Sequence, residues 1–228
     1  MVGAALLLLL AAAALARADA APAAVPDGAA GAPGDGSGGW WTSVGILTGS
    51  TQLDANLADY QWDTRPQMAW GAEARHGRGR FAGGLRLWRT QTTQQMDAPG
   101  VTSAPVVHST SLELLAQGRI VEGWGTRLLA SASAGRLFLG YSPDQVTIDL
   151  GGGSGPTEVA LAPVQEWIVG GGLSLERALG VRWSMSLEVD RRVFALDTAH
   201  RNGAVIETGR ESFGEWSARL GFARLFNR

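Results

Sequence analysis

The sequence predicts an all-β protein: an eight-stranded antiparallel up-and-down transmembrane β-barrel with short turns at one end and long loops at the other. Three observations predict it. Apolar and polar residues alternate in successive segments, the connections between these segments alternate in length, and aromatic residues gather near the segment ends. A period of two is typical of strands with two different faces. An even strand count with connections sorted by length is typical of membrane-spanning barrels.

The N-terminal residues predict an export signal. Residues 4–15 are an unbroken run of Ala and Leu, and Ala-Arg-Ala-Asp-Ala follows at 16–20. A short apolar core before an A-x-A site is typical of a secretory signal peptide, and a spanning helix needs about 20 apolar residues. We therefore expect a signal peptide at 1–20, with a buried core helix as the alternative. Residues 21–39 are rich in Ala, Pro, Gly, Asp and Ser, which predicts a disordered periplasmic leader.

The barrel domain is predicted to occupy 40–228, where alternation replaces any long helical period. Trp70 and Ala72, for example, alternate with Gly71 and Glu73. The predicted strands are 40–48, 68–75, 81–88, 110–117, 127–134, 166–176, 182–190 and 215–226.

The connections between these strands fall into two classes. The short ones are 76–79, 120–125 and 178–180, and the long ones are 49–65, 91–106, 142–163 and 196–211. This sorting places the short turns in the periplasm and the long loops outside the cell. Within the long loops, β-forming runs flank a Gly-rich tip and follow Asn202-Gly203, a type I′ turn signal. We expect hairpins there that extend the barrel wall beyond the bilayer.

Aromatic residues are expected to form girdles at the two membrane interfaces, where amphipathic rings are enriched. In the predicted topology, Trp70, Trp167 and Trp216 lie near the outer strand ends, and Trp183 and Phe226 near the periplasmic ends. Trp88 also lies near a strand end, but the alternation of its strand directs its side chain toward the interior of the barrel.

Charged residues share the face opposite the apolar one. They are Glu73, Glu113, Glu166, Glu176, Glu188, Asp190 and Glu215 with Arg75, Arg86, Arg127, Arg182, Arg192 and Arg219. An Arg facing lipid near the midplane costs about 2–4 kcal/mol, so we expect these groups inside the barrel, where side chains fill the lumen. The predicted lumen ionic network consists of Glu73, Arg86, Glu113, Arg127, Glu166, Glu188 and Arg219. A narrow conducting channel is the alternative.

Composition excludes several classes of function. The formal charge of −2 offers no basic face for a nucleic acid, and the absence of Cys excludes disulfides, a lipid-anchoring Cys and thiolate metal sites. The Gly-rich segments lack the pattern of a phosphate-binding loop, and the histidines lack metal-ligand spacing. We expect no cofactor, no metal and no catalytic residue.

The closing segment 216–226, Trp-Ser-Ala-Arg-Leu-Gly-Phe-Ala-Arg-Leu-Phe, alternates and ends on an aromatic residue, although Asn227 and Arg228 follow it. With the strand count and the loop asymmetry, it resembles the small eight-stranded outer-membrane barrels of the OmpA/OmpX type. The resemblance implies a bacterial outer-membrane location, contact with outer-membrane lipid and lipopolysaccharide, passage through the barrel-assembly machinery, and a monomer.

The expected function is non-enzymatic: a structural or surface-interaction role, adhesin-like, with an extracellular partner at 142–163 and 196–211. One alternative is a lipid A-modifying hydrolase. Some small outer-membrane barrels are lipid A deacylases with a His and a Ser two residues apart, whereas Thr110 stands two residues after His108 and Ser109 faces the other way. A secreted lipocalin-like binder is a further alternative, which requires a polar outer face.

Overall fold

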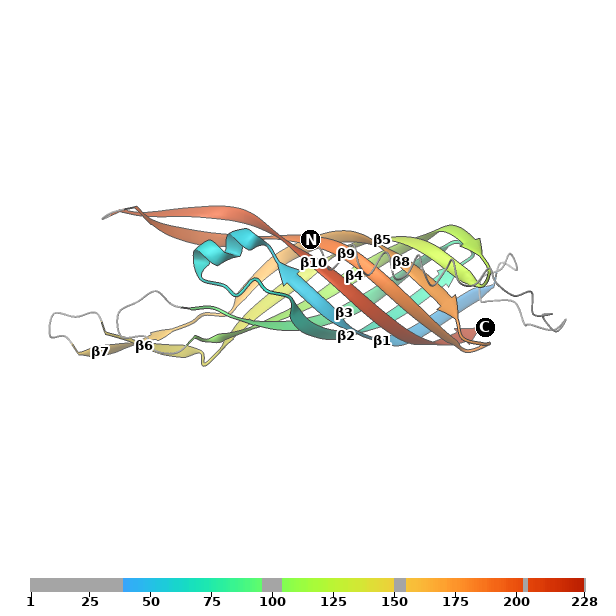
Figure 1. Ribbon diagram of the computed structural model, residues 1–228, viewed down its shortest axis with the longest axis horizontal. Helices are drawn as coiled ribbons and strands as arrows, with labels where there is room; N and C mark the ends of the chain where they lie inside the picture. The colour runs from blue at the N-terminus through green and yellow to red at the C-terminus, as the bar shows by residue number, and fades with distance from the viewer. Residues whose placement is uncertain (1–38, 96–103, 150–154, 203–204, 228) are drawn as a thin grey trace. The chain divides into compact units, whose positions relative to one another are not determined.

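The computed structural model describes residues 39–95, 104–149, 155–202 and 205–227, and the strands in this part form a closed antiparallel barrel. Neighbouring strands around the barrel follow the order β1-β10-β9-β8-β5-β4-β3-β2 (Figure 1). The barrel strands are β1 (Trp40–Leu53), β2 (Gln67–Arg78), β3 (Phe81–Thr93), β4 (Val106–Gly123), β5 (Thr126–Ser142), β8 (Val164–Ala178), β9 (Trp183–Asn202) and β10 (Val205–Asn227). The predicted eight-stranded up-and-down barrel is confirmed.

The first and last strands close the barrel. β1 pairs with β2 from Trp40↔Arg78 onward and with β10 from Trp41↔Asn227 onward. Each strand therefore has two partners within the barrel, and closure satisfies the backbone groups that an open sheet would leave at its edges. No helix in the described ranges is long and apolar enough to cross a membrane.

The short turns are tighter than the sequence predicted. β2 runs on to Arg78, so the turn lies at residues 79–80 and the predicted position 76–79 is wrong. β4 likewise absorbs most of the predicted turn 120–125, with a bulge after Arg119. Only Trp124 and Gly125 remain between β4 and β5, with φ of 51° and 72°. Positive φ at both central residues is the type I′ geometry that matches strand twist, which is why two residues suffice.

The strands at the long-loop end reach further than predicted. β1 extends to Leu53 because residues 49–53 pair with β10, and β9 and β10 continue together to the pair Val205↔Asn202. The loop predicted at 196–211 is therefore mostly a two-stranded ribbon, as the expected wall extension requires. Gly203, half of the predicted turn signal, lies outside the described residues. A 3-10 helix, η2 (Ala55–Tyr60), follows β1 at the same end (Figure 1).

The hairpin of β6 (Gln145–Asp149) and β7 (Pro156–Ala160) does not extend the wall. It forms a two-stranded sheet of its own, hydrogen-bonded to no barrel strand among the described residues. Pro143 and Pro163 stand at its two junctions with the barrel. Proline has no N–H to donate to a ladder, so the pairing of β5 with β8 stops before them.

Candidate functional site

The outer face of the barrel is apolar along its whole circumference. In β2 exposed and buried residues alternate strictly from Met68 onward, and Met68 itself is 81% exposed. Leu114 in β4, Ile46 in β1 and Leu173 in β8 also project outward. Their exposed fractions are 69%, 68% and 53%. A continuous apolar surface of this extent is unfavourable in water and marks contact with lipid or another apolar phase.

All five predicted girdle residues lie on this outer face, with exposed fractions between 42% and 63%: Trp70, Trp167, Trp183, Trp216 and Phe226. Several carry a guanidinium over their rings. Arg136 lies 4.4 Å from the ring centroid of Trp167, and Arg224 lies 5.2 Å from that of Phe226. An Arg stacked in this way keeps its charge beside a ring at the end of the apolar surface.

Buried charges fill the middle of the barrel. The Arg86 guanidinium contacts the carboxylates of Glu73 at 2.5 Å and Glu188 at 2.8 Å. Arg219 pairs with Asp190. Because low-dielectric surroundings make an unpaired charge very costly, buried charges of this kind require a neighbour of opposite sign.

A second group of buried charges lies around Arg192, whose side chain is 1% exposed. We call the two groups together the central layer. Its guanidinium lies 2.8 Å from Glu113 and 2.5 Å from Glu215, and it also donates to the hydroxyls of Ser111 and Ser217. Two carboxylates on different strands thus share one cation across the lumen.

Trp88 completes this layer from inside the barrel, where it is 2% exposed. Its indole Nε1 donates to the Thr51 hydroxyl at 3.1 Å, and Arg219 lies 4.8 Å from its ring centroid. Trp88 therefore belongs to the interior, as its parity indicated. The layer is a packed ionic cross-section of the lumen.

The structure divides the predicted lumen network into three places. Glu73, Arg86, Glu113, Glu188 and Arg219 lie in the central layer described above. Two other predicted members lie apart from it. Arg127 contacts Glu122 at 3.0 Å near a short turn, and Glu166 contacts Arg210 at 2.5 Å near the long loops.

Arg182, also expected inside, is exposed in the turn before β9. β9 begins one residue later than predicted, at Trp183, so Arg182 lies outside the alternating region.

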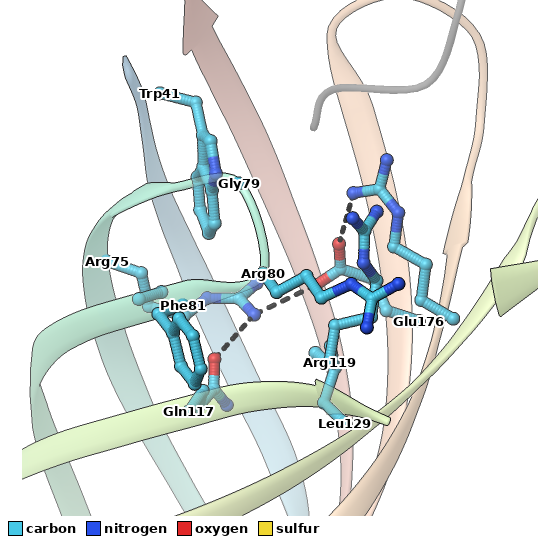
Figure 2. Close-up of a pocket in the computed structure, with 11 residues that line it drawn as sticks. Trp41, Arg75, Gly79, Arg80, Phe81, Gln117, Arg119, Leu129 and Glu176 are labelled. Carbon is cyan, nitrogen blue, oxygen red and sulfur yellow. Dashed lines mark hydrogen bonds and ion pairs between the residues drawn. The ribbon is translucent and has the colours of Figure 1, made fainter. Parts of the chain in front are cut away.

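The short-turn end of the interior is closed by polar contacts (Figure 2). Arg75 donates to Gln117 at 3.1 Å and contacts Glu176 at 2.9 Å, and Figure 2 shows it bridging the two. Arg119 pairs with Glu122 beside it. The cavity left among these side chains has a volume of about 30 Å³, far below the roughly 300 Å³ at which small-molecule sites begin.

The long-loop end is different, and the sequence reasoning missed it. Here the inward side chains are apolar and buried: Leu53, Leu57, Trp62, Val107, Leu137, Leu139, Ile168, Phe194, Leu196 and Phe213. A cavity of about 330 Å³ lies among the outermost of them. A signal was present, because Leu137 and Leu139 continue the inward alternation of β5 beyond its predicted end at 134.

Neither His76 nor His108, the two histidines whose side chains the structure describes, is brought together with a nucleophile and an acid. His108 in β4 is half-buried and lies on the same outward face of the strand as Leu112 and Leu114. Glu113 faces the interior instead, where its carboxylate accepts a hydrogen bond from the Ser111 hydroxyl at 2.6 Å. His76 lies in β2, not in a turn, and its Nδ1 is 2.9 Å from the Thr42 hydroxyl. His200 lies in β9, where a loop was expected. No group of metal-ligating side chains occurs within the described ranges.

Comparison with known proteins finds similarity only among solved structures. No family model matches the chain, and no curated protein matches its sequence. Among solved structures, Neisserial surface protein A is similar with a TM-score of 0.46 and 8% identity over 81% of this chain and 96% of that one. Ail of Yersinia pestis gives 0.46 and 11% over 82% and 99%. The outer-membrane protein AlkL gives 0.44 and 14% over 91% and 98%.

Proposed function

We propose that this chain, which has the fold of the small eight-stranded outer-membrane barrels, is an outer-membrane protein with a structural and surface-interaction role. Its lumen is closed, and it holds its long-loop segments outside the cell. The observation that carries the proposal is the partition of side chains across the barrel wall: apolar residues outside, and buried, paired charges inside. In a water-soluble barrel the apolar and charged faces would be exchanged, because burying apolar side chains lowers the free energy and burying charged ones raises it.

The loop asymmetry supports the orientation. Turns of two residues connect β2 to β3 and β4 to β5, whereas η2, the β6–β7 hairpin and the β9–β10 ribbon all lie at the other end. In outer-membrane barrels the short turns face the periplasm. The proposed surroundings are lipopolysaccharide and phospholipid along the wall, with the assembly machinery engaged only during insertion.

The ribbon formed by 195–202 and 205–213 supports the surface-interaction role. The pairing of β8 with β9 ends at Phe194, and that of β1 with β10 ends at Glu215. Beyond these residues the two strands pair only with each other within the described residues, so each offers an outer edge. An unpaired strand edge presents backbone donors and acceptors to which a partner strand can be added.

Two experiments test the proposal. Membrane fractionation with a heat-modifiability gel should place the chain in the outer membrane and show a mobility change on boiling. A freely water-soluble monomer in the absence of detergent would refute the membrane assignment.

The surface role is tested by grafting inert loops of equal length in place of 142–163 and 196–211, singly and together. Binding of the folded protein to host cells or matrix should fall with the graft at equal surface abundance. Binding that is unaffected by the double graft would refute the role, and the heat-modifiability gel controls for folding of each graft.

The two alternatives have their own assays. The ionic cross-section favours a closed lumen, so the folded protein should give no channel conductance in a planar bilayer. The acyl pattern of lipid A, compared by mass spectrometry in cells with and without the protein, should be unchanged. Stable conductance or a missing acyl chain would replace the surface role with a channel or a hydrolase.

A further inference from the structure

The cavity at the long-loop end is built from parts of the chain that are distant in sequence. η2 and the residues after it supply Leu57, Tyr60 and Trp62, and β10 supplies Phe213. The outer parts of β5, β8 and β9 supply further walls, including Leu139, Val164 and Leu196. At about 330 Å³ the volume lies at the lower end of the range of small-molecule sites, about 300–1,000 Å³.

Nine of the twelve residues that line the cavity are apolar or aromatic, and Gln94, Asp197 and Thr198 supply polar groups to it. Leu57 and Phe213 are each 1% exposed and Leu139 is 3% exposed. The rim groups satisfy one another: the Tyr60 hydroxyl donates to Glu211 at 2.8 Å, and Thr198 donates to the same carboxylate at 3.2 Å. Within the described ranges, the buried side-chain atoms without a hydrogen-bond partner all belong to residues outside the cavity lining.

The segment over the cavity is fixed in place before any ligand arrives. Asp54 donates its backbone N–H to Gly214 at 2.8 Å, and its carboxylate accepts from the N–H of Gly214 at 3.0 Å. At the other end of the segment, Asp63 donates to the carbonyl of Thr93 at 2.8 Å. Anchors at both ends and the edge-to-face packing of Tyr60 on Phe213, with ring centroids 5.8 Å apart, fix this segment against the barrel. A preformed cavity lowers the ordering cost of binding.

We propose that this cavity binds a small, uncharged and largely apolar molecule, such as a fused-ring or branched hydrocarbon with few polar groups. Water in contact with apolar walls is released when such a molecule enters, and that release favours binding. An anionic ligand would lose its hydration without gaining a cationic partner, because the carboxylates of Glu211, Asp197 and Glu166 lie at this end of the barrel and the guanidinium of Arg210 is already engaged by Glu166 and Asp197. The inference does not rest on the surface-interaction role, since it concerns inward side chains of the ribbon, such as Leu196 and Phe213, and not the outer edges of its strands.

The test uses methyl NMR of the full barrel in lipid nanodiscs with naphthalene as the probe. Methyl signals of Leu57, Val164 and Leu196 should shift along a saturable curve. Those of Leu85 and Leu114, on the outer face, should shift linearly, because naphthalene that only partitions into lipid has no fixed number of sites. A saturable shift therefore distinguishes binding in the cavity from partitioning into the bilayer within one sample.

Variants and a second probe complete the design. Val164→Trp should fill the cavity and raise the half-saturation concentration by at least about tenfold, equivalent to about 1.4 kcal/mol. Val159→Trp, the same change at an exposed position of β7, should leave it unchanged. If Val164→Trp does not fold by the heat-modifiability gel, Leu196→Gln serves instead by making the wall polar.

Naphthalene-2-carboxylate, with the same rings and a charge, should give no saturable response. Linear shifts at the cavity methyls, equal saturation in the filled variant, or equal saturation by the carboxylate would each overturn the proposal.

Discussion

Replacing Arg192 by Met tests the ionic layer most directly. Arg192 is 1% exposed, and its guanidinium is shared by Glu113 at 2.8 Å and Glu215 at 2.5 Å. Met retains much of the apolar volume and removes the charge, so two buried carboxylates lose their cation. Breaking a buried ion pair from one side costs about 3–5 kcal/mol, and we expect a loss of unfolding free energy in this range. Urea unfolding in lipid vesicles, followed by tryptophan fluorescence and by the gel mobility change, measures it.

Two further variants separate charge from packing. Arg192→Met combined with Glu113→Gln and Glu215→Gln removes the unpaired charges, and most of the lost free energy should return, because replacing a whole buried ionic group by neutral residues is often close to neutral. Arg191→Met, one residue earlier and exposed on the outer face over Trp216, is the matched control and should cost less than about 1 kcal/mol. A single variant as stable as the control, or a triple variant no more stable than the single one, would refute the reasoning.

Three other predictions concern the wall, the strand contacts and the outer loop. Leu114→Arg, at the middle of β4 on the outer face, should lower the unfolding free energy in vesicles by about 2–4 kcal/mol; no loss would contradict a lipid-facing position. Gly135→Ala should destabilise the barrel by about 1–3 kcal/mol, since its Cβ would lie 2.0 Å from a backbone oxygen of β4. Gly140→Ala has open space within 4 Å and should be nearly neutral in the same urea assay. A hydrogen bond from the Arg65 side chain lowers the pKa of Asp63 to about 2, so this contact stabilises the loop above the unfolded pKa of 3.8 and is lost as the pH falls toward 2. Carboxyl NMR should show this midpoint, and Arg65→Ala should return it toward 3.8; an unchanged midpoint would contradict the assignment.

Much of the barrel was predictable because its signals are local. A period of two assigns each side chain to a face from its immediate neighbours, and so Glu73 and Arg86 were placed inside and Trp70 and Trp216 outside without knowledge of the pairing. The strand number and the sorting of connections are likewise properties of consecutive segments. The predicted boundaries were less accurate: β2 and β4 run into the predicted turns, because pairing with a neighbour extends a strand past the point where its own alternation fades.

The composition of the lumen at each height was decided by tertiary structure alone. Arg86 meets Glu188 across 102 residues of sequence, and Arg127, on the same face, meets Glu122 beside a turn instead. Parity gives the face of a side chain, but its height depends on the stagger between strands, which accumulates around the closed barrel. The same stagger brings the apolar ends of β5, β8, β9 and β10 to one level and forms the cavity beneath η2. The sequence by itself therefore determined which side chains face inward, and only closure of the barrel decided which of them meet.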